Sequence, residues 1–300
     1  MTQLSAETEI EETIVTSQAR NTVWGDLQRV AHTLEFVDVD GSATRVLRAG
    51  EGPPLVLLHG TGGHLEAYAR NIAGLARHFH VVAYDMLGHG LSDKPDVPYT
   101  PEVLSRHLLG LLDALDLAAV HLSGESLGGW VAAWTAAHHP ERVKGLVLNT
   151  PGNVANHPET MRRVKELSLK AASDPTRAVI RGRLEWLFKD KTLVTDELID
   201  IRQRIYSQEG YLRATENQVA VQEPEVREPF AWRADWAASI AAPTMLLWTD
   251  DDPTASVEDA KVLQAWIPGS SFALIEGAGH WPQWERPEEF EKELITFLTS

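Results

Sequence analysis

A serine set between glycines is the first feature of this sequence that could do chemistry. Residues 124–128 read Gly-Glu-Ser-Leu-Gly and fit the pattern G-x-S-x-G, with "AVHLS" before the turn and "GGWVAAW" after it. This pattern is typical of a sharp strand-to-helix turn, where glycines let backbones approach closely and the serine hydroxyl stands clear of the sheet. We therefore predict that Ser126 is a nucleophile. The alternative is a tight packing turn with an unreactive serine.

A serine hydroxyl needs a base to take its proton. His280 is the best placed of the 12 histidines, because "EGAGHWPQWE" follows an expected strand and precedes the last expected helix. It also follows the serine and an acidic candidate, in the order Ser…Asp…His. His59 and His89 lie in glycine-containing turns ahead of the serine. We expect these two to hold loops together through hydrogen bonds.

The third group of such a site is a carboxylate that orients the imidazole and stabilises its cation. Asp250, Asp251 and Asp252 follow the apolar run "TMLLW". Three adjacent carboxylates cannot all be buried, because like charges repel. One is the partner and the others cap a helix or face water, and the spacing alone leaves the choice open. The loop "HGTGG" (59–63) ends another apolar run, and its N–H groups could join that of Leu127 around a developing oxyanion.

The composition argues against several other functions. The chain has no cysteine, which excludes disulfides, thiolate nucleophiles and cysteine-based zinc sites. It also lacks H-E-x-x-H and H-x-H-x-D-H metal motifs, and its glycine loop lacks the lysine of a phosphate-binding loop. We therefore expect no metal and no cofactor. A net charge of −16 argues against nucleic acid and anionic membranes as partners.

The start of the chain, "MTQLSAETEIEETIVTSQ", is acidic and has no apolar core, so it does not resemble a signal peptide. No apolar run reaches the roughly 18 residues of a membrane span. Together with the absence of cysteine, these features lead us to expect a cytoplasmic protein.

Short apolar runs alternate with helical periodicity along most of the chain. The strands and helices that this alternation predicts must position Ser126, His280 and the aspartates. An Asp40-Gly41 turn joins two expected strands, and "LVLLHG" reads as a buried strand. Further expected strands are 80–85, 118–124 and 143–150, and expected helices are 66–77, 100–117, 127–139 and 287–298. Such alternation predicts an α/β fold with a mostly parallel sheet flanked by helices on both faces.

The alternation stops between residues 152 and 232, where amphipathic stretches such as "TDELIDIRQRIY" occur and no strand is evident. We therefore expect 31–151 and 233–300 to form the core, with 152–232 as a helical cap inserted after the strand that ends near Asn149. An independent helical domain is the alternative, although no Gly/Ser-rich or Pro-rich hinge is present. Residues 1–30 read as an N-terminal extension, disordered up to about residue 21.

Taken together, residues 33–300 resemble the α/β-hydrolase family. Within it they look most like the meta-cleavage-product hydrolases, which cut carbon–carbon bonds in ring-opened aromatics. The stretches that carry the resemblance are "YARNIAGLARHFHVVAYDMLGHGLSDKP", "SGESLGGW", "LVTDELIDIRQRIY" and "GHWPQWERPEEF". The resemblance implies the α/β-hydrolase fold, a homodimer, and a cofactor-free serine hydrolase acting on a small 2-hydroxy-6-oxo-dienoate.

The same resemblance assigns individual residues. It maps the acid to Asp252 and the oxyanion donors to Thr61 and Leu127. Arg202 matches the arginine that grips the substrate carboxylate, and Trp281 matches the tryptophan beside the catalytic histidine. Arg202 also stands out on chemical grounds, because a guanidinium can form a bidentate pair with a carboxylate. No acidic residue lies three or four positions from it on the expected helix, which argues against a surface ion pair within that helix.

The chain also departs from that family, which commonly carries an asparagine immediately before the nucleophile where this sequence has Glu125. A carboxylate pointing inward there would disfavour a developing dienolate. A carboxylesterase or lactonase with the same three residues is therefore the alternative enzyme, and a non-catalytic binding protein of this fold is a further one. A haloalkane dehalogenase would need an aspartate in place of the serine. The insert residues 186–188 could line an acyl site or simply pack.

Overall fold

One sheet of eight strands forms the centre of the protein. The computed structural model describes residues 22–154 and 157–300. The strand order is β1-β2-β4-β3-β5-β6-β7-β8, in which β2 pairs antiparallel with β1 and β4 and all other neighbours are parallel. The strands are β1 (His32–Val39), β2 (Ser42–Ala49), β3 (Pro54–Leu58), β4 (His80–Tyr84), β5 (Val120–Glu125), β6 (Val143–Asn149), β7 (Thr244–Thr249) and β8 (Ser271–Ile275).

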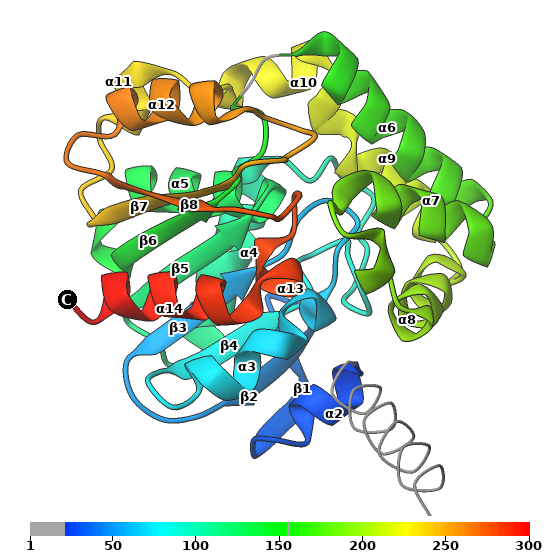
Figure 1. Ribbon diagram of the computed structural model, residues 1–300, viewed down its shortest axis with the longest axis horizontal. Helices are drawn as coiled ribbons and strands as arrows, with labels where there is room; N and C mark the ends of the chain where they lie inside the picture. Colours follow the sequence, from blue (N-terminus) through cyan, green and yellow to red (C-terminus); the bar gives the residue numbers. More distant parts are fainter. Residues whose placement is uncertain (1–21, 155–156) are drawn as a thin grey trace, which may run out of the picture.

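Helices cover both faces of this sheet (Figure 1). Side chains alternate between faces along a strand, so Leu55 and Leu57 of β3 enter one hydrophobic core while Val56 and Leu58 enter the other. The larger elements around the sheet are α3 (Ala69–Leu75), α4 (Pro101–Ala114), α5 (Leu127–His138), α12 (Val257–Trp266) and α14 (Pro287–Leu298). The predicted α/β-hydrolase fold class is therefore confirmed.

Between β6 and β7 the described residues form only helices, as the sequence predicts. Figure 1 shows α6 to α9 gathered beyond one end of the strands. The insert comprises α6 (Pro158–Ser173), α7 (Arg177–Leu187), α8 (Asp196–Tyr206), α9 (Tyr211–Gln218), α10 (Pro224–Arg227), α11 (Ala234–Ala237) and the 3-10 turns η3 (Lys191–Leu193), η4 (Ala220–Gln222) and η5 (Glu228–Phe230). Because β6 ends at Asn149, the cap leaves the sheet where the sequence placed it.

One predicted helix differs from the structure. The sequence favours a helix over 66–77, but the chain forms the 3-10 turn η1 (Leu65–Tyr68) before α3 begins. Buried polar contacts hold this turn: Leu65 N donates to Asp85 Oδ1 at 2.7 Å, and Glu66 accepts from Arg45 at 2.6 Å. Tertiary hydrogen bonds thus override the local helical preference.

The short elements at the chain ends and turns are α2 (Val23–Leu27), η2 (Pro140–Arg142) and α13 (Pro282–Glu285). The first of these contacts the cap, since Val23 N donates to Glu197 Oε2 of α8 at 2.6 Å. The disorder predicted for the first 21 residues lies outside the described residues. Within the described residues, no helix combines the length and the apolar character needed to cross a membrane.

Candidate active site

Ser126 sits on the sharp turn that the sequence predicts between β5 and α5. Its backbone has φ 53° and ψ −118°, a conformation that costs a non-glycine residue about 1–3 kcal/mol and needs support from its surroundings. Ser126 N donates to Asn149 O at 3.1 Å, and Ser126 O accepts from Gly152 N at 2.7 Å. A Cβ on Gly128 would lie 2.3 Å from Leu58 O. The glycine is therefore required for the close approach of two backbones.

His280 lies in the loop between β8 and α13, and it shares a pocket with Ser126. Its backbone N–H donates to Leu187 O of α7 at 2.7 Å, which ties the loop to the cap. Its Nδ1 lies 2.8 Å from Asp252 Oδ2. Asp252 Oδ1 in turn accepts from the backbone N–H and the hydroxyl of Thr254, each at 2.7 Å.

The structure also separates the three aspartates that sequence spacing leaves equivalent. The Asp252 carboxylate is fully buried against His280, as the resemblance implies. Asp250 instead accepts from Lys189 Nζ at 2.9 Å and from Gly277 N at 2.8 Å, and Asp251 is exposed. Burial opposes ionisation of Asp252, but the charge and hydrogen bond of His280 outweigh it and lower the pKa of Asp252.

A second carboxylate contacts the other ring nitrogen of His280, which sequence reasoning did not predict. Glu125 Oε1 lies 3.1 Å from His280 Nε2, and its side chain is only 1% exposed. Within the described residues, no hydrogen bond joins Ser126 Oγ to His280. Burial lowers the pKa of His280, but Asp252 and then Glu125 outweigh it and raise that pKa to about 10. Both ring nitrogens of His280 therefore face carboxylate oxygens.

Thr61 and Leu127 line the same pocket as Ser126 and His280. Thr61 lies in the loop after β3, and Leu127 is the first residue of α5. The first N–H groups of a helix have no intrahelical acceptor, so that of Leu127 is available to an anion. These are the positions expected for a pair of oxyanion donors.

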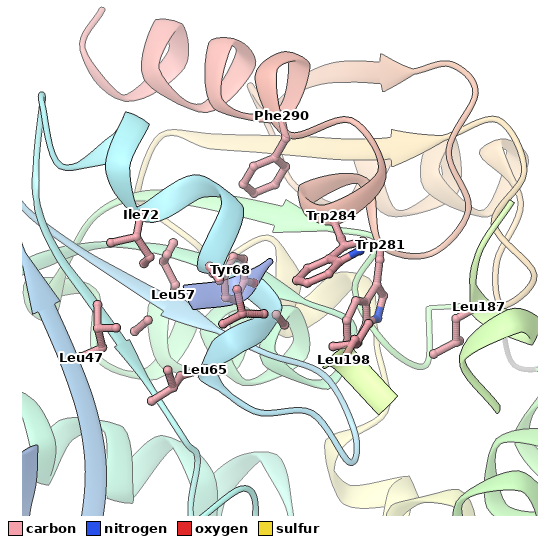
Figure 2. Packing of buried hydrophobic residues seen from close by; sticks show 14 of the residues in the cluster. Leu47, Leu57, Leu65, Tyr68, Ile72, Leu187, Leu198, Trp281, Trp284 and Phe290 are labelled. Carbon is pink, nitrogen blue, oxygen red and sulfur yellow. The ribbon is translucent and has the colours of Figure 1, made fainter. Parts of the chain in front are cut away.

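Arg202 is fully buried on α8, and its Nε, Nη1 and Nη2 atoms have no hydrogen-bond partner in the described structure. Its guanidinium carbon lies 5.1 Å from the centre of the Trp281 ring and 5.8 Å from that of Tyr206. Trp281 lines the pocket, while Arg202 is not among its lining residues. Figure 2 shows Trp281 in one buried cluster with Leu187 and Leu198 of the cap.

A second buried arginine, Arg183 of α7, lines the pocket directly. Its Nη2 donates to Thr61 O at 3.1 Å, but its Nε and Nη1 have no partner within the described residues. Burial and the nearby Arg202 charge lower the pKa of Arg183. Burial raises the pKa of Tyr206, yet the two arginines outweigh it and lower that pKa. Among the described residues, neither Arg183 nor Arg202 has a carboxylate within ion-pair distance, and the carboxylates of Glu125 and Asp252 contact His280 instead.

His59 and His89 hold loops together, as predicted. His59 Nε2 accepts from Met86 N at 3.1 Å, and its Nδ1 lies 2.9 Å from Gly60 O. His89 Nδ1 lies 3.0 Å from Leu87 O, and burial lowers the pKa of His89 to about 4. Both rings are neutral supports of the loops that border the site.

Comparison with known proteins gives a match to one family. The family described as alpha/beta hydrolase fold matches residues 53–287. A 2-hydroxy-6-oxo-6-(2'-aminophenyl)hexa-2,4-dienoic acid hydrolase of Metapseudomonas resinovorans is 31% identical over 276 residues, which cover 90% of this chain and 92% of that protein.

Solved structures with a similar fold match along most of the chain. The meta-cleavage product hydrolase CumD of Pseudomonas fluorescens IP01 superposes with a TM-score of 0.77 at 26% identity, covering 91% of this chain and 99% of that one. An enol-lactonase of Burkholderia xenovorans LB400 superposes with a TM-score of 0.75 at 25% identity, covering 88% of this chain and 100% of that one.

Proposed function

Since the chain belongs to the α/β-hydrolase family, we propose that it hydrolyses a carbon–carbon bond in a 2-hydroxy-6-oxo-dienoate, with Ser126, His280 and Asp252 as a cofactor-free catalytic triad. The observation that carries this proposal is the combination of the Ser126 turn and the His280–Asp252 contact with a fully buried arginine beside Trp281 that has no hydrogen-bond partner among the described residues. The similarity to the dienoic acid hydrolase of Metapseudomonas resinovorans supports the substrate class.

The reaction begins with proton transfer. His280 helps to ketonise the bound dienol and then takes the proton of Ser126. The Ser126 oxygen attacks the ketone carbon, and the Thr61 and Leu127 N–H groups stabilise the resulting oxyanion. Collapse of the oxyanion breaks the carbon–carbon bond, and the dienol fragment leaves after its carbanion takes the proton from His280. The acyl group stays on Ser126 until water, deprotonated by His280, releases it as a carboxylic acid. Asp252 stabilises the imidazolium throughout.

Arg202 binds the substrate carboxylate in this proposal. A buried guanidinium whose three nitrogens have no partner in residues 22–154 and 157–300 strongly favours a bidentate anion, because its own desolvation is otherwise uncompensated. Arg183 supplies a second cation at the pocket wall. Apolar neighbours such as Trp186 and Leu187 leave space at the pocket for the non-polar part of the substrate.

Two variants on one helix test the carboxylate assignment. Arg202→Gln removes the buried charge, whereas Arg204→Gln changes an exposed arginine on the same helix. With a synthetic 2-hydroxy-6-oxo-6-phenyl dienoate, we expect R202Q to raise KM by about tenfold or more, since a charged hydrogen bond contributes about 1.5–3 kcal/mol. R204Q should match the wild type. An unchanged KM in R202Q would refute the assignment.

A carboxylesterase or lactonase with the same triad is the second candidate. Glu125 favours it, because this carboxylate lines the pocket and would repel a developing dienolate. Parallel assays of the dienoate and of short nitrophenyl esters separate the two functions through the ratio of their kcat/KM values. Ser126→Ala should abolish both activities, and a fluorophosphonate should label Ser126. Full activity of S126A on both substrates would refute the serine mechanism.

A further inference from the structure

Glu125, the residue before Ser126, contacts the ring nitrogen of His280 that would have to accept the Ser126 proton. Glu125 Oε1 lies 3.1 Å from His280 Nε2, the ring atom that faces away from Asp252. An ionised carboxylate has no proton to donate, so this ion-pair contact is attractive only while Nε2 carries the proton. On the other side of the ring, Asp252 Oδ2 accepts a hydrogen bond from Nδ1 at 2.8 Å. With both nitrogens protonated, the ring has no lone pair for the Ser126 proton.

Glu125 and Ser126 compete for the same nitrogen from adjacent positions. A Cβ built on Gly60 would lie 2.5 Å from Glu125 Oε2, 2.8 Å from its Oε1 and 2.9 Å from Ser126 Cβ. The carboxylate and the serine side chain therefore lie side by side against the same glycine. Oε2 has no hydrogen-bond partner in the described structure, so His280 is the main polar contact of this buried group. Ser126 and His280 also line one pocket.

We propose that Glu125 is a positioning residue that holds His280 in its charged form, so that Ser126 becomes a nucleophile only after His280 Nε2 has lost its proton. This proposal rests on the serine mechanism above. In the first step hydroxide or water takes the Nε2 proton, and the imidazolium becomes a neutral imidazole. Two lone-pair acceptors then face each other across the Glu125 contact and repel. The ring turns to Ser126, whose proton passes to Nε2 as its oxygen attacks the substrate.

The other groups around His280 do not replace Glu125 in this role. The hydroxyls of Thr254 and Thr150 lie 3.2 and 3.4 Å from Nδ1, on the Asp252 side of the ring. From the cap, Leu187 contributes a backbone carbonyl, and Arg183 lines the pocket without a hydrogen bond to the ring. From α13, Glu285 accepts from Gly279 N at 2.8 Å. Glu125 is thus the one described carboxylate at Nε2.

The pH dependence of kcat/KM tests this proposal in the full-length protein. The probe is a short nitrophenyl ester, whose charge does not change over the range studied. Glu125→Gln keeps the size of the side chain and removes its charge. We expect the midpoint of the acid limb to fall by about 1–3 pH units in E125Q, the shift that one adjacent opposite charge produces. At pH 7 the kcat/KM of E125Q should then exceed that of the wild type by about tenfold for each pH unit by which the midpoint falls.

Three further variants make the result interpretable. Glu276→Gln removes an exposed carboxylate from the loop that carries His280 and should leave the midpoint unchanged. Glu125→Asn is a second neutral variant should E125Q fold poorly. An inactive Ser126→Ala together with an unmoved midpoint in E125Q would overturn the role of Glu125 alone. An active S126A would overturn the serine mechanism instead.

A second readout is independent of turnover. The ring nitrogens of His280 can be titrated by ¹⁵N NMR in S126A and in S126A/E125Q. We expect the double variant to lose its Nε2 proton at lower pH by a similar 1–3 units. Coincident titration curves would overturn the proposal.

Discussion

Replacing Arg202 by methionine should make the protein more stable while weakening the binding of an anionic substrate. The guanidinium is fully buried, and none of its three nitrogens has an acceptor among the described residues. Each buried polar group without a partner costs about 1–3 kcal/mol, and an unpaired buried charge costs more. Methionine is long and flexible enough to keep contact with the Trp281 and Tyr206 rings.

A lower limit for the gain in stability comes from counting only one of the three unsatisfied Arg202 nitrogens. The free energy of unfolding of R202M should then exceed that of the wild type by about 1–3 kcal/mol. For a chain of 300 residues this corresponds to a rise in Tm of about 2–5 °C. Urea and thermal unfolding of the wild type, R202M and the exposed-site control R204M measure it. In the dienoate assay, KM of R202M should rise by at least about tenfold.

Two results would refute this reasoning. A loss of more than about 1 kcal/mol in R202M would show that the arginine stabilises the fold through a partner, against the unpaired state inferred here. A gain in stability with an unchanged KM would show that the buried charge does not bind the substrate carboxylate. R204M should leave both quantities unchanged, since Arg204 is exposed.

Three other predictions concern the turn and the triad. In urea unfolding, Gly128→Ala should lower the free energy of unfolding by about 1–3 kcal/mol or more, because its Cβ would lie 2.3 Å from Leu58 O. Gly182→Ala has open space around its Cβ and should raise the free energy of unfolding by about 0.5–1 kcal/mol in the same assay. Asp252→Asn should lower kcat by about 10⁴-fold with circular dichroism unchanged, because the amide favours the wrong imidazole tautomer. The pKa of His280 is raised to about 10 from an ordinary 6.5, so its contribution to stability is full below pH 6.5 and lost as the pH rises to 10. The stability difference between wild type and His280→Gln should therefore shrink over that range, and a constant difference would contradict the ion pairing.

The sequence could predict the parts of the site that the backbone dictates. Glycine spacing and the strand-to-helix context place Ser126, and chain order places His280, because both depend on local geometry and on the order of β–α units. The choice among Asp250, Asp251 and Asp252 depends on which way a turn directs each side chain. Residue spacing does not contain that information, and only the resemblance pointed to Asp252.

Arg183 was missed although a signal was present. It lies three residues after Ile180 and four before Leu187, both buried, so the helical period places it on the buried face of α7. A charged residue on such a face needs a partner or a ligand. The orientation of Glu125 has no comparable signal, because its contact with His280 joins segments 155 residues apart along the chain.

The buried charges around the pocket show how this site tolerates the additional carboxylate of Glu125. Glu125 and Asp252 bring two negative charges, while Arg183 and Arg202 bring two positive ones, and all four side chains contact or adjoin the pocket walls. With His280 neutral these charges balance, and with His280 protonated one positive charge is in excess. A bound monoanion therefore favours the imidazolium and opposes its use as a base. The loss of the Nε2 proton and the binding of a carboxylate are linked, so an anionic dienoate should need a higher pH for turnover than a neutral ester on the same triad.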